Sequence, residues 1–163
     1  METGLVTRKK DDSFIEDCTI ETDQMAMIPD SYIDITAEKI RIYKLLDSLP
    51  NDKEIDRARE RLTDRFGQMP PEVDNLFNVV KIRNLGGKLG FEKIIIKNGM
   101  MIMFFISNSM SPYYKSGVFS SILSRINANE RLFNLKQTEG KLKIVSRGID
   151  SLPLALNTLR KLQ

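Results

Sequence analysis

Residues 92–106 read EKIIIKNGMMIMFFI, and this stretch decides the fold class. Two runs rich in β-branched and large apolar residues, 92–97 and 100–106, are separated by Asn-Gly at 98–99. Asn-Gly favours the type I′ turn, whose twist matches that of two antiparallel strands joined by a two-residue loop. The sequence therefore predicts a β-hairpin, and the nearly unbroken apolar character of the second run predicts a strand buried on both faces.

A second unit of the same kind follows toward the C-terminus. Apolar residues at helical spacing predict a helix over about 115–127. A second hairpin pairs 131–137 with 141–147 around Glu-Gly at 139–140, and a final helix begins at about Ser151. The resulting order is ββαββα. Two such hairpins can join into one four-stranded antiparallel sheet with both helices on one face.

Three helices are predicted before the first hairpin, over about 36–49, 51–66 and 71–88. Their limits rest on residues that commonly start or stop helices. These are Thr36 and Asn51 as N-caps, Pro50 and Gly67 as stops, and Pro71 in the first turn of the third helix.

The N-terminal part of the chain has weaker signals. Residues 18–22 alternate as a short strand does, and residues 25–28 are either its partner or its continuation. Residues 1–16 are charged and lack periodicity, which predicts a loosely ordered arm. We therefore expect an α+β fold, with short N-terminal strands and three helices followed by the ββαββα unit. Residues 17–163 would form one domain, with a helical part over about 36–88 and a β-rich part over about 91–163.

The residue types that are missing restrict the chemistry strongly. The 163 residues contain no histidine and one cysteine, Cys18, which excludes an imidazole base, a Cys–His nucleophile, an internal disulfide and a Cys-rich zinc site. No GxxxxGK[ST] phosphate loop occurs, and the acidic clusters lack the spacing of a calcium loop. We expect a non-catalytic chain without cofactor or metal. The single cysteine and the charged N-terminal stretch predict a cytoplasmic location.

Charge is distributed unevenly along the sequence. Residues 1–35 carry 3 basic and 9 acidic side chains, residues 36–90 carry 11 and 9, and residues 91–163 carry 11 and 4. A shift of this kind indicates stretches with different surface roles rather than one uniform surface.

The basic excess of the last stretch predicts an alternative function, in which Lys93, Lys97 and Lys143 contact nucleic acid. However, the Lys/Arg-Gly-Phe strand motif of four-stranded RNA-binding sheets is absent. We therefore interpret Phe104 and Phe105 as core residues. An enzyme is the third and weakest hypothesis, and a pocket that gathers two or more carboxylates would favour it.

The junction between the second and third predicted helices, residues 62–73, reads LTDRFGQMPPEV. It resembles the signature of DRFG followed by Pro-x-x-Val in the C-terminal domain of bacterial transcription-repair coupling factors. Three further segments resemble that family in the same order. They are IPDSYI at 28–33, RIYK at 41–44 and LGFEK at 89–93. The resemblance covers the chain from about Asp17 to its C-terminus.

This resemblance implies a regulatory role. In that family, the full-length protein is an ATP-driven translocase on double-stranded DNA that engages stalled RNA polymerase and recruits the damage-recognition ATPase of nucleotide excision repair. The C-terminal domain is not catalytic. It packs on an N-terminal repair-protein-like module and masks the binding surface for that ATPase until polymerase is engaged. We expect this chain to be such an autoinhibitory domain, with no membrane partner.

The resemblance places the interdomain contact on the charged side of the DRFG helix, at Asp64 and Arg65. Three residues before the aspartate the family usually has an acid, whereas this chain has Arg61, so the partner surface is expected to differ. The residues alone also allow a local interpretation. In that interpretation, Arg65 lies near the carbonyl groups at the helix C-terminus and Asp64 is simply solvated.

Overall fold

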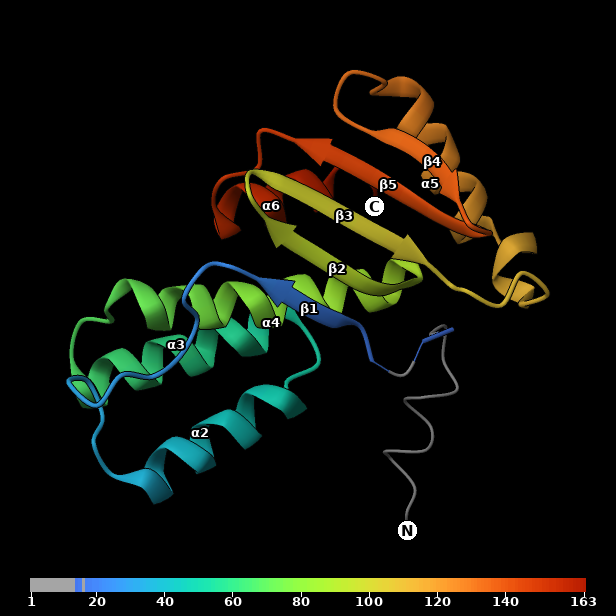
Figure 1. Ribbon diagram of the computed structural model, residues 1–163. Helices are drawn as coiled ribbons and strands as arrows, with labels where there is room; N and C mark the ends of the chain where they lie inside the picture. The colour runs from blue at the N-terminus through green and yellow to red at the C-terminus, as the bar shows by residue number, and fades with distance from the viewer. Residues whose placement is uncertain (1–13, 16) are drawn as a thin grey trace, which may run out of the picture.

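The structure is a computed structural model that describes residues 14–15 and 17–163. The predicted arm over residues 1–16 therefore falls almost entirely outside the described residues. Five strands, five α-helices and one 3-10 helix follow one another within the described part (Figure 1). In chain order they are β1 (Thr19–Thr22), α2 (Thr36–Ser48), α3 (Asp52–Phe66), α4 (Pro71–Leu89), β2 (Phe91–Lys97), β3 (Met100–Phe105), η1 (Pro112–Lys115), α5 (Gly117–Ala128), β4 (Asn134–Thr138), β5 (Lys141–Arg147) and α6 (Leu152–Arg160).

The five strands form one mixed sheet in the order β1-β2-β3-β5-β4. The pairs β2–β3, β3–β5 and β5–β4 are antiparallel. Both hairpins turn on the predicted dipeptides, since Asn98, Gly99, Glu139 and Gly140 all have positive φ angles. The α+β class is confirmed. The sequence did not indicate that β1 would join this sheet as a fifth strand, parallel to β2.

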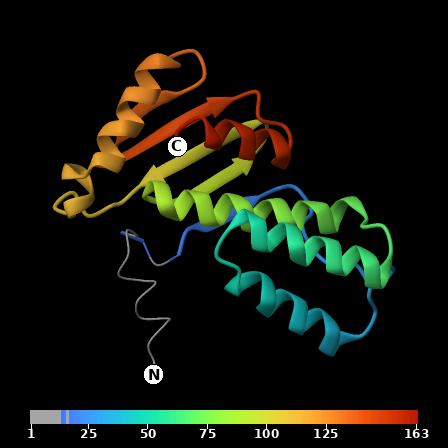
Figure 2. The same cartoon turned by 180° about the vertical axis from the view of Figure 1, so that it is seen from behind.

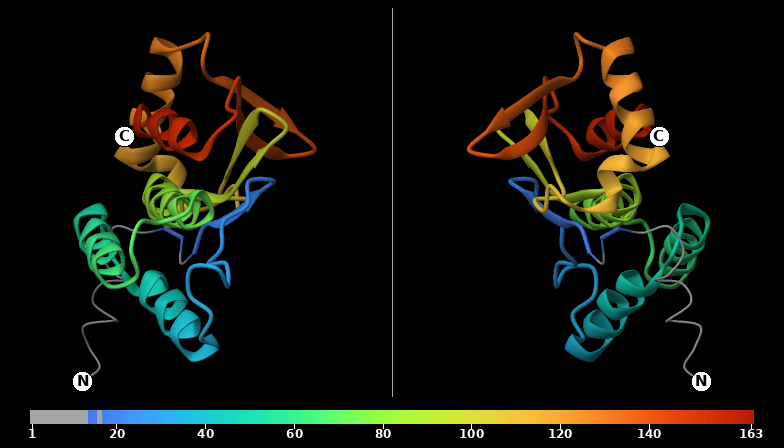
Figure 3. Two further views of the ribbon diagram at one scale, coloured as in Figure 1. Left: turned by 90° about the vertical axis from the view of Figure 1, so that its left-hand side faces the viewer. Right: turned by 90° about the vertical axis from the view of Figure 1, so that its right-hand side faces the viewer.

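The helices are placed unequally around the sheet. Helices α4, α5 and α6 cover one face, whereas α2 and α3 pack against α4 beyond the β1 edge (Figures 2 and 3). No helix among the described residues crosses the opposite face, which we call the open face. The molecule therefore has a helical layer on one side of the sheet and a solvent-facing sheet surface on the other.

Helix α4 connects two hydrophobic cores. Ile82 and Leu89 belong to the core between the sheet and helices α4, α5 and α6. Val73 and Phe77 belong to the core among α2, α3, α4 and the segment that precedes α2. A helix that buries residues on both sides needs apolar side chains around most of its circumference, as α4 has.

Close packing of α4 on the sheet depends on one glycine. A Cβ atom placed on Gly86 would lie 2.8 Å from Cδ1 of Ile94 and 3.0 Å from Sγ of Cys18. Both of those side chains are buried. On the next residue, Gly87, a Cβ would meet nothing within 4 Å. Gly86 therefore lets the helix approach β1 and β2 closely.

Two local predictions near the N-terminus are wrong. Helix α2 begins at Thr36, but Ile35 occupies the N-cap position and no side chain caps the helix. Residues 25–28 form no strand, because the backbone passes over the helical core instead of the sheet. There, the N–H of Ile28 donates to the Tyr43 hydroxyl at 2.8 Å.

Strand β3 is buried on one face only, contrary to the prediction. Its side chains alternate between buried and half-buried positions. Met101, Met103 and Phe105 face the helices, whereas Met100, Ile102 and Phe104 lie on the open face. The assignment of Phe105 to the core is confirmed, and that of Phe104 is wrong.

Candidate interdomain interface

The three residues singled out on the DRFG helix share one side of α3. Arg61, Asp64 and Arg65 are spaced i, i+3 and i+4, and all three are exposed. The adjoining side of the helix packs into the helical core through Ile55, Ala58 and Leu62. The fold therefore presents the predicted residues together and toward solvent.

The ends of α3 are fixed by local contacts. At its start, Oδ1 of Asn51 accepts a hydrogen bond from the N–H of Glu54 at 2.9 Å, as the predicted cap requires. At its end, Gly67 has a φ of 92°, and its carbonyl accepts a hydrogen bond from the Tyr32 hydroxyl at 2.7 Å. The Tyr32 ring also lies against Phe66, with centroids 6.1 Å apart. These contacts hold the last turn of α3 and so position Arg65.

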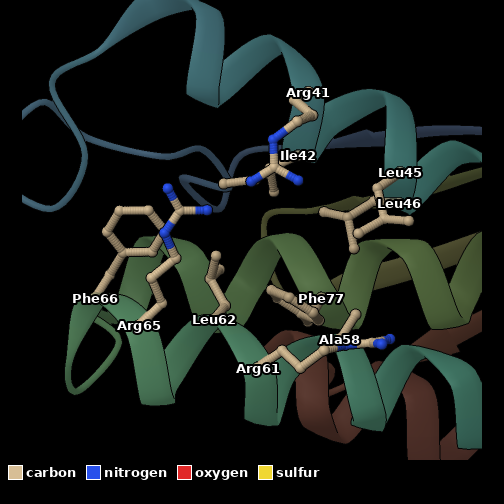
Figure 4. Close-up of a pocket in the computed structure, with 10 residues that line it drawn as sticks. All are labelled: Arg41, Ile42, Leu45, Leu46, Ala58, Arg61, Leu62, Arg65, Phe66 and Phe77. Carbon is tan, nitrogen blue, oxygen red and sulfur yellow. The ribbon is translucent and has the colours of Figure 1, made fainter.

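A groove of about 370 Å³ lies between α2 and α3, beside these residues (Figure 4). Its apolar lining comes from α2, α3 and α4, and is formed by Ile42, Leu45, Leu46, Ala58, Leu62, Phe66 and Phe77. Three arginines complete it. Arg41 extends from α2 and Arg65 from α3, so that their guanidinium groups approach each other over the groove, while Arg61 lies on the α3 wall.

One carboxylate stands beside the three arginines. Glu38, on α2, forms ion pairs with Arg41 and with Nη1 of Arg65, the latter at 3.0 Å. The hydrogen bond from Arg41, together with the positive charges of Arg41 and Arg65, lowers the pKa of Glu38. Arg65 also lies over the Phe66 ring, with Cζ 4.9 Å from the centroid. The groove therefore keeps a positive excess.

Two of the predicted residues have no internal partner. Among residues 14–15 and 17–163, neither Arg61 nor Asp64 makes a side-chain hydrogen bond or ion pair. Asp64 lies in the last turn of α3, where the partial negative charge of the helix C-terminus disfavours an acid. The helix terminus therefore does not stabilise an acid at this position.

Sequence reasoning missed the contribution of α2 to this site. Arg41 and Glu38 were not predicted as site residues, although the first lines the groove and the second pairs with Arg65. Their i, i+3 spacing indicated an ion pair on one helix face. Nothing in the linear sequence indicated that this face would meet α3.

The basic residues of the alternative function lie elsewhere, on the open face. Lys93 and Lys97 come from β2 and Lys143 from β5. Nζ of Lys93 is 2.6 Å from a carboxylate oxygen of Glu21, and Nζ of Lys97 is 3.9 Å from the other. Lys143 instead lies over Phe104, 5.7 Å from the ring centroid. The three lysines therefore share a surface, but it is separate from the α2–α3 groove.

The described residues show little that resembles catalytic equipment. They contain no group of three or more His, Cys, Asp or Glu side chains suited to a metal ion. A second hollow, near Arg59, includes one carboxylate, Asp74, and the α2–α3 groove lining includes none. Burial, with a smaller contribution from Asp17, raises the pKa of Cys18 to about 12, so the thiol stays protonated at neutral pH.

Within the described part of the chain, no helix combines the length and the apolar character that crossing a bilayer requires.

These features define a small α+β domain in which a unit of three helices, α2, α3 and α4, is joined to a mixed sheet. The family model described as TRCF domain matches residues 22–116. The chain belongs to the transcription-repair-coupling factor family. Its fold is similar to that of a crystal structure of the C-terminal domain of transcription-repair coupling factor, with a TM-score of 0.74, 18% identity, and coverage of 90% of this chain and 91% of that one.

Curated relatives support the same assignment. The transcription-repair-coupling factor of Rickettsia prowazekii is 30% identical over 146 residues, which cover 86% of this chain and 13% of the relative. That of Rickettsia typhi is 33% identical over 116 residues, which cover 70% of this chain and 10% of the relative. The Escherichia coli protein is 26% identical over 100 residues, which cover 61% of this chain and 9% of the relative. The chain thus spans about a tenth of the length of these relatives.

Proposed function

We propose that this chain is an autoinhibitory, protein-docking domain of a transcription-repair coupling factor. It packs through the exposed side of α3 and the adjoining α2–α3 groove on an N-terminal repair-protein-like module of the same longer protein. In that position it masks the module's binding surface for the damage-recognition ATPase of excision repair. Engagement of a stalled RNA polymerase on double-stranded DNA by the full-length translocase releases the contact.

One observation carries the proposal. Arg61 and Asp64 are exposed on α3 and have no ion pair among the described residues, and Arg61 lines a groove with an apolar floor and two further arginines. Charged groups without internal partners, placed around an apolar hollow, suit a surface that another protein covers.

The local interpretation explains only part of this arrangement. It accounts for Arg65, a base in the last turn of α3 that also pairs with Glu38. It treats Asp64 as a solvated acid, which the helix terminus does not stabilise. A basic group on the partner, placed against Asp64, would supply the missing stabilisation.

A polar contact of this kind suits a reversible lock. Two modules of one chain meet at an effective concentration on the order of millimolar, so a weak interface stays mostly closed. Shifting such an equilibrium from 99% closed to 99% open takes about 5.5 kcal/mol of differential binding. Polymerase and DNA would supply that free energy in the full-length protein.

Calorimetric titration of this chain against the separately produced N-terminal module tests the proposal. A variant with Asp64→Ala and Arg65→Ala should bind about tenfold more weakly or worse, equivalent to about 1.4 kcal/mol. The matched control removes one acid and one base that are exposed elsewhere, by Glu130→Ala and Lys161→Ala, and should bind as the parent does. Absence of binding at millimolar concentration would refute the lock.

The nucleic-acid alternative remains a separate prediction. It requires a DNA affinity that falls steeply with salt and is lost when Lys93, Lys97 and Lys143 are changed to glutamate. The ion pairs of Lys93 and Lys97 with Glu21 partly neutralise the positive charge on which this alternative relies.

A further inference from the structure

The open face of the sheet carries three rows of side chains that run across the strands. The strand register defines each row, because cross-strand partners point to the same face. The first row is Thr19, Lys93, Phe104, Lys143 and Lys136; the middle row is Glu21, Ile95, Ile102, Val145 and Asn134; the third row is Lys97, Met100 and Arg147. Three apolar side chains therefore form the centre of the middle row, between two rows that contain cations, and Glu21 and Asn134 end that row.

The cations of β4 and β5 are not neutralised by the fold. Lys136, Lys143 and Arg147 form no ion pair among the described residues. Two of them instead contact the apolar side chains of β3. Lys143 lies over Phe104, and Nη1 of Arg147 is 3.2 Å from Sδ of Met100. Among the described residues, the positive charge of Lys143 and Arg147 is thus held beside the apolar centre of the middle row without a counter-charge, whereas Lys93 and Lys97 pair with Glu21.

The spacing of the rows matches the width of an α-helix. Residues two apart on a strand are about 7 Å apart, so each cation row lies about 7 Å from the middle row. A helix is about 10 Å across with its side chains, and residues flanking its apolar stripe project to either side. A helix lying along the middle row would therefore place its flanking side chains over the two cation rows.

We propose that the open face docks an amphipathic helix whose apolar stripe is bordered by acidic residues. The stripe packs on the half-buried Ile95 and Ile102, beside the buried Val145, and its carboxylates pair chiefly with Lys143 and Arg147. Such a helix would cover the sheet face that α4, α5 and α6 leave open. This surface is separate from the α2–α3 groove, so the inference does not depend on the proposed autoinhibitory contact.

Single-stranded nucleic acid fits the same surface less well. Stacking of bases needs exposed aromatic rings, and the only ring in the three rows is that of Phe104, which is half-buried and lies beneath Lys143. The centre of the middle row is aliphatic and would face sugar and phosphate groups. Both an acidic helix and a nucleic acid would complement the positive charge of this face. Only the helix would also pack on its apolar side chains.

A binding assay with the complete chain tests this inference. The probe is a synthetic amphipathic peptide of about 20 residues, with leucine along one helical stripe and glutamate on both flanks. A peptide of the same composition with scrambled order and an oligothymidylate of about 20 nucleotides are compared with it. We expect the amphipathic peptide to bind about tenfold or more tightly than either comparison ligand.

Variants locate the contact. Lys143→Glu with Arg147→Glu should weaken peptide binding by about tenfold or more. Arg125→Glu with Lys161→Glu changes the net charge equally at exposed positions of the helical layer, and should leave binding unchanged. Ile102→Thr keeps a β-branched side chain suited to a strand but puts a hydroxyl into the apolar centre of the middle row, and should weaken binding several-fold. Unchanged thermal midpoints of the charge variants verify that they fold.

The opposite results overturn the inference. Equal binding of the scrambled peptide would show that charge alone is recognised. Tighter binding of the oligothymidylate, lost in the Lys143→Glu and Arg147→Glu variant, would assign the face to nucleic acid. No peptide binding at millimolar concentration, or equal weakening by the control variant, would show that this face is not a docking surface for such a helix.

Discussion

The neighbouring glycines Gly86 and Gly87 in α4 allow a matched test of how closely this helix packs on the sheet. Replacing a helix-interior glycine with alanine stabilises by roughly 0.5–1 kcal/mol where the site is open. Gly87→Ala is such a case, because its Cβ meets nothing within 4 Å. At Gly86 the same atom would lie 2.8 Å from Cδ1 of Ile94 and 3.0 Å from Sγ of Cys18. Both side chains are buried, at 0% and 2% exposure, so neither moves aside freely.

Overpacking of a core by a methyl group costs roughly 1–3 kcal/mol. The helix-propensity gain is common to both variants, so Gly86→Ala should be less stable than Gly87→Ala by about 1–3 kcal/mol. For a domain of this size, each kcal/mol shifts the thermal midpoint by about 2–4 °C. Urea unfolding followed by circular dichroism measures the difference directly.

A double-mutant cycle separates the clash from other effects. Ile94→Val removes Cδ1, so Gly86→Ala should cost less in that background, with a coupling free energy of about 0.5 kcal/mol or more. The reasoning fails if Gly86→Ala is as stable as Gly87→Ala, or if the cycle shows no coupling. Either result would mean that α4 does not approach β2 as closely as the structure places it.

Three further predictions concern the site helices and the cysteine. Asn51→Ala should lower the free energy of unfolding by about 1 kcal/mol through loss of the α3 cap, whereas Asn51→Gly should cost only a few tenths, as urea unfolding can measure. The lowered pKa of Glu38 in the folded state adds stability that is complete above the pKa of an unfolded glutamate, about 4.3, and is lost as the pH falls through the lowered value. Unfolding curves of Glu38→Gln between pH 7 and pH 3 should therefore show a smaller acid-induced loss than those of the parent, and identical losses would contradict the ion pairs. Because the Cys18 thiol has a pKa of about 12 and is buried, a thiol reagent at pH 8 should label it slowly in the native protein and rapidly in urea; fast native labelling would contradict this placement.

Local sequence signals predicted most elements of the fold, because each has its own physical cause. Asn98-Gly99 sets a turn through its backbone preference, and Asn51 and Gly67 fix the ends of α3 through a cap and a positive φ. Pairing of β1 with β2 was missed because a short strand does not encode its partner. Phe104 was misplaced because a fully apolar run hides the alternation that distinguishes the two faces of a strand.

The candidate site was predictable only in part. The resemblance to a family singled out Asp64 and Arg65 on the charged side of the DRFG helix, and Arg61 as a departure from the family pattern. The groove depends on how α2 packs against α3, which brings Glu38 and Arg41 to the same place. That packing follows from the shape of the complete helical core and cannot be read from either helix alone.

Helix α4 gives the two candidate surfaces a common support. It contributes to the helical core beneath the α2–α3 groove through Phe77, and to the sheet core behind the open face through Ile82. A chain segment that is close-packed in both cores cannot shift in one without disturbing the other. The groove and the open face are therefore supported by one shared framework. Because the groove lining and the rows of the open face have no residue in common, the two proposed contacts can be tested by separate substitutions.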